Sequence, residues 1–197
     1  MKRTKEIERN TRGQADCPEW YSHRKKRLTA SNFGLVMKRR ESIFPNSILN
    51  KILNASHSST VSGSCRWGKD NEEAALLKYF MFKKSSNTEV QVCRSVGLVV
   101  NPKWSWLGAS PDALLCDPME PSCYGAVEIK CPSSKTNLTI NEACGDTNFY
   151  LEYKDGKASL NRDHIYFYQL QGVMAICQLS WIDFVVYTVK DLHVDLL

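Results

Sequence analysis

The sequence contains no apolar run that approaches the roughly 18–20 residues needed to span a bilayer. This predicts no transmembrane helix and no membrane partner. Residues 1–6 are charged and are followed by no apolar segment of the kind found in secretory signals. We therefore expect an intracellular protein, nuclear or cytoplasmic, that is not secreted. No internal repeat and no low-complexity segment is visible.

Cys-x-x-Cys motifs are also absent, although the chain has eight cysteines. Closer pairing is typical of zinc and iron–sulfur sites, so the spacing argues against such a cluster. Cys116 and Cys123 are the nearest pair, and a bound metal there is the alternative. Because disulfide bonds are rare in an intracellular setting, we predict reduced thiols that pack as small apolar side chains.

The bulk composition is that of an ordinary soluble domain. The chain has 197 residues, of which 43% are hydrophobic and 24% are charged. We predict a flexible N-terminus over residues 1–16 and a single domain with its own core over residues 17–197. The net charge of +5 and the pI near 8.7 are compatible with a nucleic-acid partner, without establishing one.

An acidic residue followed by a Glu-x-Lys triplet is the most informative pattern. Asp112 follows a Ser-Pro pair, and Glu128 and Lys130 come sixteen and eighteen residues later on an apolar background. Side chains alternate along a strand, so Glu128 and Lys130 share one face while their apolar neighbours anchor the other. Two carboxylates beside an ammonium group are the layout of a metal-dependent nuclease. The alternative for Glu128 and Lys130 is a structural ion pair.

Periodicity predicts an α/β (α+β) fold in which a helix is followed by three strands, a second helix and a last strand. Glu72 and Glu73 both fit the sheet-facing phase of the first long helix, so phase alone does not separate them. A short helix after residue 28 is expected to be capped by Thr29 or Ser31. Residues 54–64 read as a loop. The expected helices cover residues 68–84 and 163–179, and the expected strands cover 90–100 with a bulge at Gly97, 106–115, 126–130 and 181–189.

Four blocks, in order over residues 20–190, resemble the lambda exonuclease and YqaJ-like viral recombinase family of the PD-(D/E)XK nucleases. The resemblance implies a restriction-endonuclease-like core, with a mixed central sheet flanked by helices, and a YqaJ-like nuclease domain over residues 17–197. The blocks are Trp20 and Arg24 with residues 28–31; Trp67, Gly68, Glu72, Ala75 and Tyr79; residues 107–112 with 128–132; and Tyr166, Gln169 and Gln171.

The resemblance also implies roles for particular residues. It selects Glu72 over Glu73 as an active-site residue and gives Lys130 a catalytic role. Gln169 is placed at the edge of the site, with satisfaction of a buried backbone group as its alternative. The implied metal ligands are Asp112, Glu128, the Ile129 carbonyl and Glu72, and the implied pocket for a DNA 5′-phosphate consists of Arg24, Ser31 and Ser110. A solvated basic face is the alternative for Arg24.

The activity implied is that of a Mg²⁺-dependent 5′→3′ exonuclease on double-stranded DNA ends, with Mn²⁺ able to substitute. Its expected settings are recombination, repair or viral DNA processing, with a single-strand annealing protein as a possible partner. A homo-trimer is implied, although the segment between residues 112 and 128 is longer than in the phage relative and the chain stops soon after its last strand. The alternatives are a structure- or sequence-specific endonuclease and an inactive DNA-binding module.

Overall fold

A computed structural model describes residues 2–53, 63–86 and 88–197. The predicted loop over residues 54–64 therefore lies outside the described residues, except for its last two, which begin a helix. The helices are α1 (Lys2–Asn10), α2 (Pro18–Arg24), α3 (Phe33–Met37), α4 (Asn46–Leu53), α5 (Gly63–Ser86), α6 (Ile140–Ala143) and α7 (Ile165–Cys177), with 3-10 turns η1 (Gln14–Asp16), η2 (Ala30–Asn32) and η3 (Ser133–Lys135).

The central sheet is mixed, as predicted. Its five strands lie in the order β10-β9-β6-β5-β2, and only the β6–β9 pair is parallel. A three-stranded sheet, β1-β4-β3, and the β7–β8 hairpin accompany it. The strands are β1 (Leu28–Thr29), β2 (Gln91–Cys93), β3 (Val99–Val100), β4 (Leu107–Ala109), β5 (Ala113–Cys116), β6 (Tyr124–Lys130), β7 (Leu151–Lys154), β8 (Lys157–Leu160), β9 (Ile182–Tyr187) and β10 (Leu192–Leu196).

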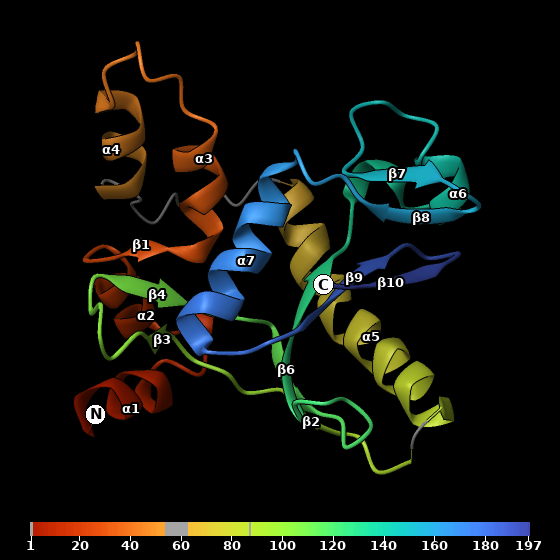
Figure 1. The fold of residues 1–197 in the computed structure, drawn as a ribbon, viewed down its shortest axis with the longest axis horizontal. Coiled ribbons are helices and arrows are strands. Elements are labelled where there is room, and N and C mark those ends of the chain that lie inside the picture. The colour runs from red at the N-terminus through yellow and green to blue at the C-terminus, as the bar shows by residue number, and fades with distance from the viewer. Residues whose placement is uncertain (1, 54–62, 87) are drawn as a thin grey trace.

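Helices α5 and α7 cover opposite faces of the central sheet (Figure 1). The predicted face of α5, with Ala75, Leu76 and Tyr79, is buried against strands β5, β6 and β9. On the other face, Leu170 and Val173 of α7 are buried in a second apolar cluster. The two long helices and the strands near residues 126–130 and 182–187 are therefore confirmed.

Two predicted strands are wrong as single elements. The segment over residues 90–100 divides into β2 and β3, which lie in different sheets, and the segment over residues 106–115 divides into β4 and β5. The chain changes sheet at residues 110–112, where Pro111 lacks the N–H that a continuous ladder would need. The expected cap is also wrong, because Thr29 precedes η2 without a side-chain capping bond and Asn32 precedes α3.

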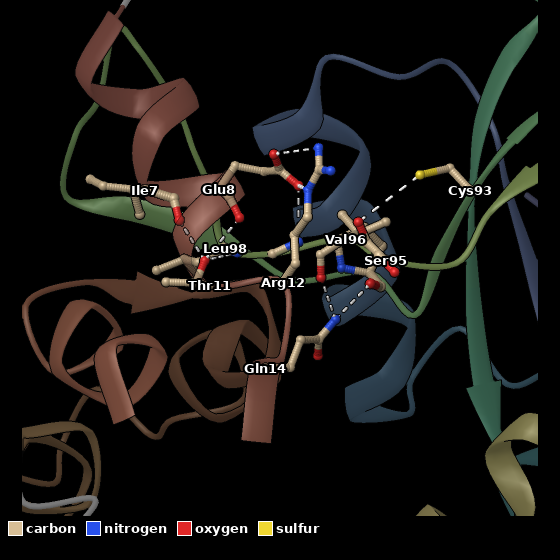
Figure 2. Close-up of polar contacts among 11 residues, drawn as sticks. Ile7, Glu8, Thr11, Arg12, Gln14, Cys93, Ser95, Val96 and Leu98 are labelled. Carbon is tan, nitrogen blue, oxygen red and sulfur yellow. Dashed lines mark hydrogen bonds and ion pairs between the residues drawn. The ribbon is translucent and has the colours of Figure 1, made fainter. Parts of the chain in front are cut away.

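The N-terminal segment, predicted to be flexible, forms α1 and η1 and packs on the chain near residue 97 (Figure 2). Thr11 is fully buried; its hydroxyl donates to the Ile7 carbonyl (2.6 Å) and accepts from the Leu98 amide (2.7 Å). A Cβ on Gly97 would lie 1.9 Å from the Glu8 carbonyl oxygen, so only glycine fits. The attachment combines these hydrogen bonds with an apolar contact, because Ile7 is buried in a small cluster with Leu98 and Val100.

The cysteine prediction is wrong for one pair. Cys116 and Cys123 are joined by a disulfide bond, with their Cα atoms 5.1 Å apart. The register of the β5–β6 hairpin explains the approach, since Cys116 lies opposite Tyr124 and Cys123 is its neighbour. Cys17, Cys93, Cys131, Cys144 and Cys177 are not in disulfide bonds. In the described part of the chain, no helix has both the length and the apolar character needed to cross a membrane.

A buried polar cluster fixes the far end of α5 to the sheet. The Lys83 ammonium lies 3.2 Å from carboxylate oxygens of both Asp117 and Asp183, and the Tyr79 hydroxyl donates to Asp183 (2.5 Å). The Lys83 side chain is 15% exposed and the two aspartates are 7% and 2% exposed. Burial, and then the Asp183 carboxylate, raise the pKa of Tyr79, so its hydroxyl stays a donor.

Lys83→Met is expected to lower the free energy of unfolding by about 3 kcal/mol, because it leaves two buried carboxylates without their cation. Urea unfolding at neutral pH measures this. Lys84→Met is the matched control, since the neighbouring lysine donates to the Thr88 carbonyl at the surface and lies over the Phe80 ring. Equal effects of the two substitutions would contradict a structural role for the buried cluster.

Candidate active site

Strand β6 presents two acid–base side chains on the α7 side of the sheet. The strand lies between β9 and β5 in the middle of the sheet. Its alternating residues Val127 and Ile129 are buried in the α5 cluster, as predicted from the sequence. Glu128 therefore points to the opposite face, where its side chain is only 5% exposed. A carboxylate this deep requires compensating partners, because burying an unpaired charge is costly.

Asp112 lies beside Glu128 because of the hairpin register. Ala113 of β5 is paired with Val127 of β6, so the preceding residue comes opposite Glu128. The Asp112 carboxylate accepts a hydrogen bond from the Ile129 amide (2.6 Å). Burial raises the pKa of Asp112 well above its ordinary value, and the nearby Glu128 carboxylate raises it further. Two carboxylates are thus held together at a cost that a bound cation would offset.

Lys130 supplies positive charge to this pair of carboxylates. Its ammonium group donates to Glu128 Oε1 (2.6 Å) and to the Ile129 carbonyl (3.2 Å). Burial alone would lower the pKa of Lys130, but the Glu128 and Asp112 carboxylates outweigh burial and raise it. The side chain is therefore a cation. The ion pair considered from the sequence does form, but it is largely buried and lies beside a second carboxylate.

Gln169 of α7 reaches the same carboxylate. Its side-chain amide donates to Glu128 Oε1, so it bonds an active-site residue and not the buried backbone group considered as the alternative. The other oxygen, Glu128 Oε2, is buried and has no hydrogen-bond partner among the described residues. An anionic oxygen left without a donor is rare in proteins and needs an explanation.

Glu72 lies on α5 at the edge of this cluster. Its side chain as a whole is exposed, yet the carboxyl group is crowded enough that partial desolvation raises its pKa, with Glu128 adding to the rise and Lys130 opposing it. Glu72 is therefore within electrostatic reach of the β6 residues. Among the described residues, no three His, Cys, Asp or Glu side chains come close enough together to hold a metal ion. The structure thus brings Asp112 and Glu128 together and leaves Glu72 as their neighbour.

Arg24 contacts Ser31 directly and is connected to Ser110 through Trp20, a residue for which the sequence predicted no role. The Arg24 guanidinium lies 4.1 Å from the centroid of the Trp20 ring, and the indole N–H of Trp20 donates to the Ser110 hydroxyl (2.9 Å). Arg24 also donates to the Ser31 hydroxyl (3.1 Å). Burial lowers the pKa of Arg24, against the opposing effects of Tyr21 and Glu128. Arg24 is therefore a fixed, partly desolvated cation, and a freely solvated basic face does not describe it.

The packing of α3 on α7 fixes the position of the neighbouring turn η2, which contains Ser31. Phe33 follows η2 directly, and a Cβ on Gly172 of α7 would lie 2.7 Å from its ring, so glycine permits the close contact. The hydroxyls of Thr29 and Ser31 lie 3.0 Å apart in a hydrogen bond. Because Ser110 is two residues before Asp112, the hydroxyl and guanidinium groups are adjacent to the carboxylates in the fold.

The donor set fits a hard divalent cation. Mg²⁺ is commonly held by one or two carboxylates, with waters and substrate phosphates completing its shell. Asp112, Glu128 and the Ile129 carbonyl provide oxygen ligands of this kind. The unpartnered Glu128 Oε2 and the raised pKa of Asp112 both indicate that the site lacks positive charge. Three of the four proposed metal ligands therefore fit, and the position of Glu72 suits an indirect role.

The described surface hollows lie elsewhere. One of about 320 Å³ is formed under α4 and is almost entirely apolar, with Leu28, Ile52 and Trp106 among its lining residues. A second of about 220 Å³ shares these residues and is bordered by Lys25, Lys26 and Arg27. Neither hollow is lined by a carboxylate or by Arg24, so the candidate site is identified by its charged cluster and not by these two hollows.

Comparison with solved structures shows the fold. An alkaline exonuclease from Laribacter hongkongensis (LHK-Exo) matches with a TM-score of 0.63 and 24% identity, over 91% of this chain and 80% of that chain. A SOX–DNA complex matches with a TM-score of 0.58 and 14% identity, over 94% of this chain and 58% of that one. The shutoff and exonuclease protein from Kaposi's sarcoma-associated herpesvirus gives a TM-score of 0.53 at 13% identity, over 92% and 59% of the two chains.

Comparison of the sequence shows the family. No curated protein matches this chain. Residues 19–180 match the family described as the YqaJ-like viral recombinase domain. The matched segment includes the carboxylates, Lys130, Gln169 and the Arg24 group, and it indicates a nuclease of the viral recombinase type. The chain therefore belongs to the YqaJ-like viral recombinase family.

Proposed function

We propose that this protein is a Mg²⁺-dependent exonuclease that hydrolyses duplex DNA from its 5′ ends, with Mn²⁺ able to replace Mg²⁺. One observation carries the proposal. A buried carboxylate, Glu128, and a partly buried one, Asp112, lie near the Arg24 cation, whose partners are the hydroxyl of Ser31 and the ring of Trp20. The first group suits phosphodiester hydrolysis and the second suits a terminal phosphate.

The chemistry follows from the charges of these residues. Asp112, Glu128 and the Ile129 carbonyl would hold the metal ion, which supplies Lewis-acid stabilisation of phosphate charge and lowers the pKa of an attacking water. Lys130 is a cation with a raised pKa, so it orients the water and stabilises negative charge instead of accepting a proton. Gln169 fixes the orientation of the Glu128 carboxylate, and Glu72 adjusts the charge at the edge of the site.

The polarity follows from the neighbouring phosphate site. If Arg24, Ser31 and Ser110 bind a terminal 5′-phosphate, the next phosphodiester bond is presented to the carboxylates, and each cycle releases a 5′-mononucleotide. The complementary strand then survives as a 3′ overhang. Such a product suits recombination, repair or viral DNA processing with a single-strand annealing protein. A homo-trimer that encircles the DNA would add processivity.

Arg24→Ala is expected to reduce digestion of 5′-phosphorylated ends roughly ten- to a hundred-fold more than digestion of 5′-hydroxyl ends, because one charge-assisted phosphate contact is lost. Initial rates on two duplexes that differ only in this phosphate measure the effect. Lys25→Ala, the adjacent exposed cation, is the control and should affect both ends alike. Equal losses for Arg24→Ala on both ends would assign Arg24 to general backbone affinity.

Polarity is tested on a linear duplex labelled on either strand. We expect 5′-mononucleotide products, protection of a strand by a blocked 5′ end and no protection by a blocked 3′ end. Digestion that begins at 3′ ends, or that releases short oligonucleotides from the interior, would overturn the assignment of the phosphate pocket.

A further inference from the structure

Tyr166 belongs to the block of Tyr166, Gln169 and Gln171, and its ring lies against the Lys130 ammonium. The proposed function gives Tyr166 no role. It is on α7, one helical turn before Gln169. The Lys130 ammonium lies 5.2 Å from the centroid of its ring. Helix α7 thus serves both halves of the β6 ion pair, since Gln169 bonds the Glu128 carboxylate and Tyr166 faces the Lys130 cation.

The contacts of Lys130 create a conflict with metal binding. Its ammonium donates to Glu128 Oε1 and to the Ile129 carbonyl, and the proposed function gives this carbonyl, together with the Glu128 carboxylate, to a divalent cation. Glu128 Oε2 has no partner among the described residues and is open to the metal ion, but the Ile129 carbonyl would lie between two cations, and their mutual repulsion opposes sharing it. When the metal ion binds, the ammonium must therefore give up at least one of its two oxygens. The aromatic face is a partner that a hard cation does not take.

We propose that Tyr166 is a positioning residue, whose ring holds the Lys130 ammonium beside the reacting phosphate once a metal ion has taken Glu128 and the Ile129 carbonyl. This rests on the proposed function. An ammonium group is attracted to an aromatic face, most strongly where water is excluded. The ring keeps Lys130 within the site as a cation, so its charge remains available in the transition state.

The surroundings of Tyr166 suit a fixed ring. Its backbone N–H donates to His164 Nδ1 (3.2 Å), which caps α7. Its ring makes edge contacts with Tyr150 at 5.1 Å and with His164 at 4.7 Å between centroids. Phe184 of β9 lies 6.1 Å away on the sheet. Because the ring is held on several sides, it offers the Lys130 ammonium one fixed position, which a mobile side chain would not provide.

Kinetics separate the ring from its hydroxyl. Tyr166→Phe keeps the ring and should retain kcat within about two-fold, whereas Tyr166→Leu should lower kcat roughly three- to thirty-fold, the range expected for one cation–π contact. KM for 5′-phosphorylated duplex and the Mg²⁺ concentration at half-maximal rate should change less than two-fold in both. Tyr168→Leu is the control on the same helix, where the ring contacts Phe167. If Tyr166→Leu folds poorly, Tyr166→Met replaces it.

A second measurement does not depend on activity. In ¹³C-lysine-labelled protein, identified with Lys130→Met, the Lys130 Cε–H signals should move upfield on addition of Mg²⁺, as the cation settles over the ring. The Tyr166→Phe protein should show this shift and the Tyr166→Leu protein should not.

Failures of the two ideas are distinguishable. Wild-type protein that hydrolyses no DNA would overturn the proposed function, while the Mg²⁺-induced shift would still test the ring. Full kcat in Tyr166→Leu, equal losses in the Phe and Leu variants, or no ring-dependent shift would overturn the role of Tyr166. A loss confined to KM would instead show that the ring shapes the DNA-binding surface, which also contradicts the proposal.

Discussion

Asp112→Asn is expected to reduce DNA hydrolysis at least about a thousand-fold while leaving the fold intact. The substitution keeps an oxygen to accept the Ile129 amide hydrogen bond and removes one of two carboxylates that would hold the metal ion. Because the ion supplies most of the charge stabilisation in phosphodiester hydrolysis, its loss removes most of the rate. Single-turnover rates on a linear 5′-phosphorylated duplex measure this. Turnover like that of the wild type would refute the assignment of Asp112.

The stability of the same variant gives an independent check. The pKa of Asp112 is raised in the folded protein, so its ionised form destabilises the fold as pH rises through that value. Without metal, Asp112→Asn should therefore be as stable as the wild type below the ordinary Asp pKa of about 3.9 and more stable above the raised value. Urea unfolding in EDTA across this window measures the difference. Asp155→Asn, in the exposed β7–β8 turn, should show neither effect.

Lys130→Met is expected to lower kcat at least about a hundred-fold without weakening Mg²⁺ binding. The ammonium acts mainly on charge that develops in the transition state. It also competes with a metal ion for the Ile129 carbonyl and repels a cation bound to the Glu128 carboxylate, so its removal should leave Mg²⁺ affinity equal or tighter. Calorimetric titration measures the affinity. Collapse of metal binding in this variant would make Lys130 a structural residue.

The metal-free Lys130→Met protein should be less stable by about 3 kcal/mol, because Glu128 then lies buried without a cation. Addition of Mg²⁺ should recover much of this loss and should stabilise the variant more than the wild type. The chain provides a matched control in Glu152 and Lys154, a second Glu-x-Lys triplet with a 2.8 Å ion pair on an exposed strand. Lys154→Met should change the unfolding free energy by less than about 1 kcal/mol and leave activity unchanged.

The same two triplets show what the sequence could predict about the site. Strand alternation correctly predicted that Glu128 and Lys130 share one face of the sheet, but it could not tell a catalytic pair from a structural ion pair. The same alternation applies to Glu152 and Lys154. The first triplet differs because the register of the β5–β6 hairpin brings the Asp112 carboxylate opposite it. The position of Asp112 in the sequence therefore indicated which triplet belongs to the candidate site. The linking role of Trp20 was not predictable, because its indole bonds Ser110 across 90 residues of chain.

For the fold, long periodic segments were predictable and short ones were not. Helices α5 and α7 and the buried strand β9 contain enough apolar residues for their patterns to be recognised in the sequence. Strands β1 and β3 have two residues each, and the edge strand β10 is only partly buried, so none has a clear pattern. The N-terminal segment was missed because much of its attachment is made by hydrogen bonds to backbone. In η1, for example, Gln14 donates to the Pro111 carbonyl (3.1 Å), which also steadies the segment before Asp112.

The most direct test of a metal-dependent, end-directed nuclease compares linear duplex DNA with covalently closed circles, each with Mg²⁺ and with EDTA. We expect the linear 5′-phosphorylated duplex to be degraded only with Mg²⁺ and the closed circle to remain intact under both conditions. Rapid nicking of the closed circle would contradict this account in favour of an endonuclease, and binding of both DNAs without hydrolysis would indicate an inactive DNA-binding module.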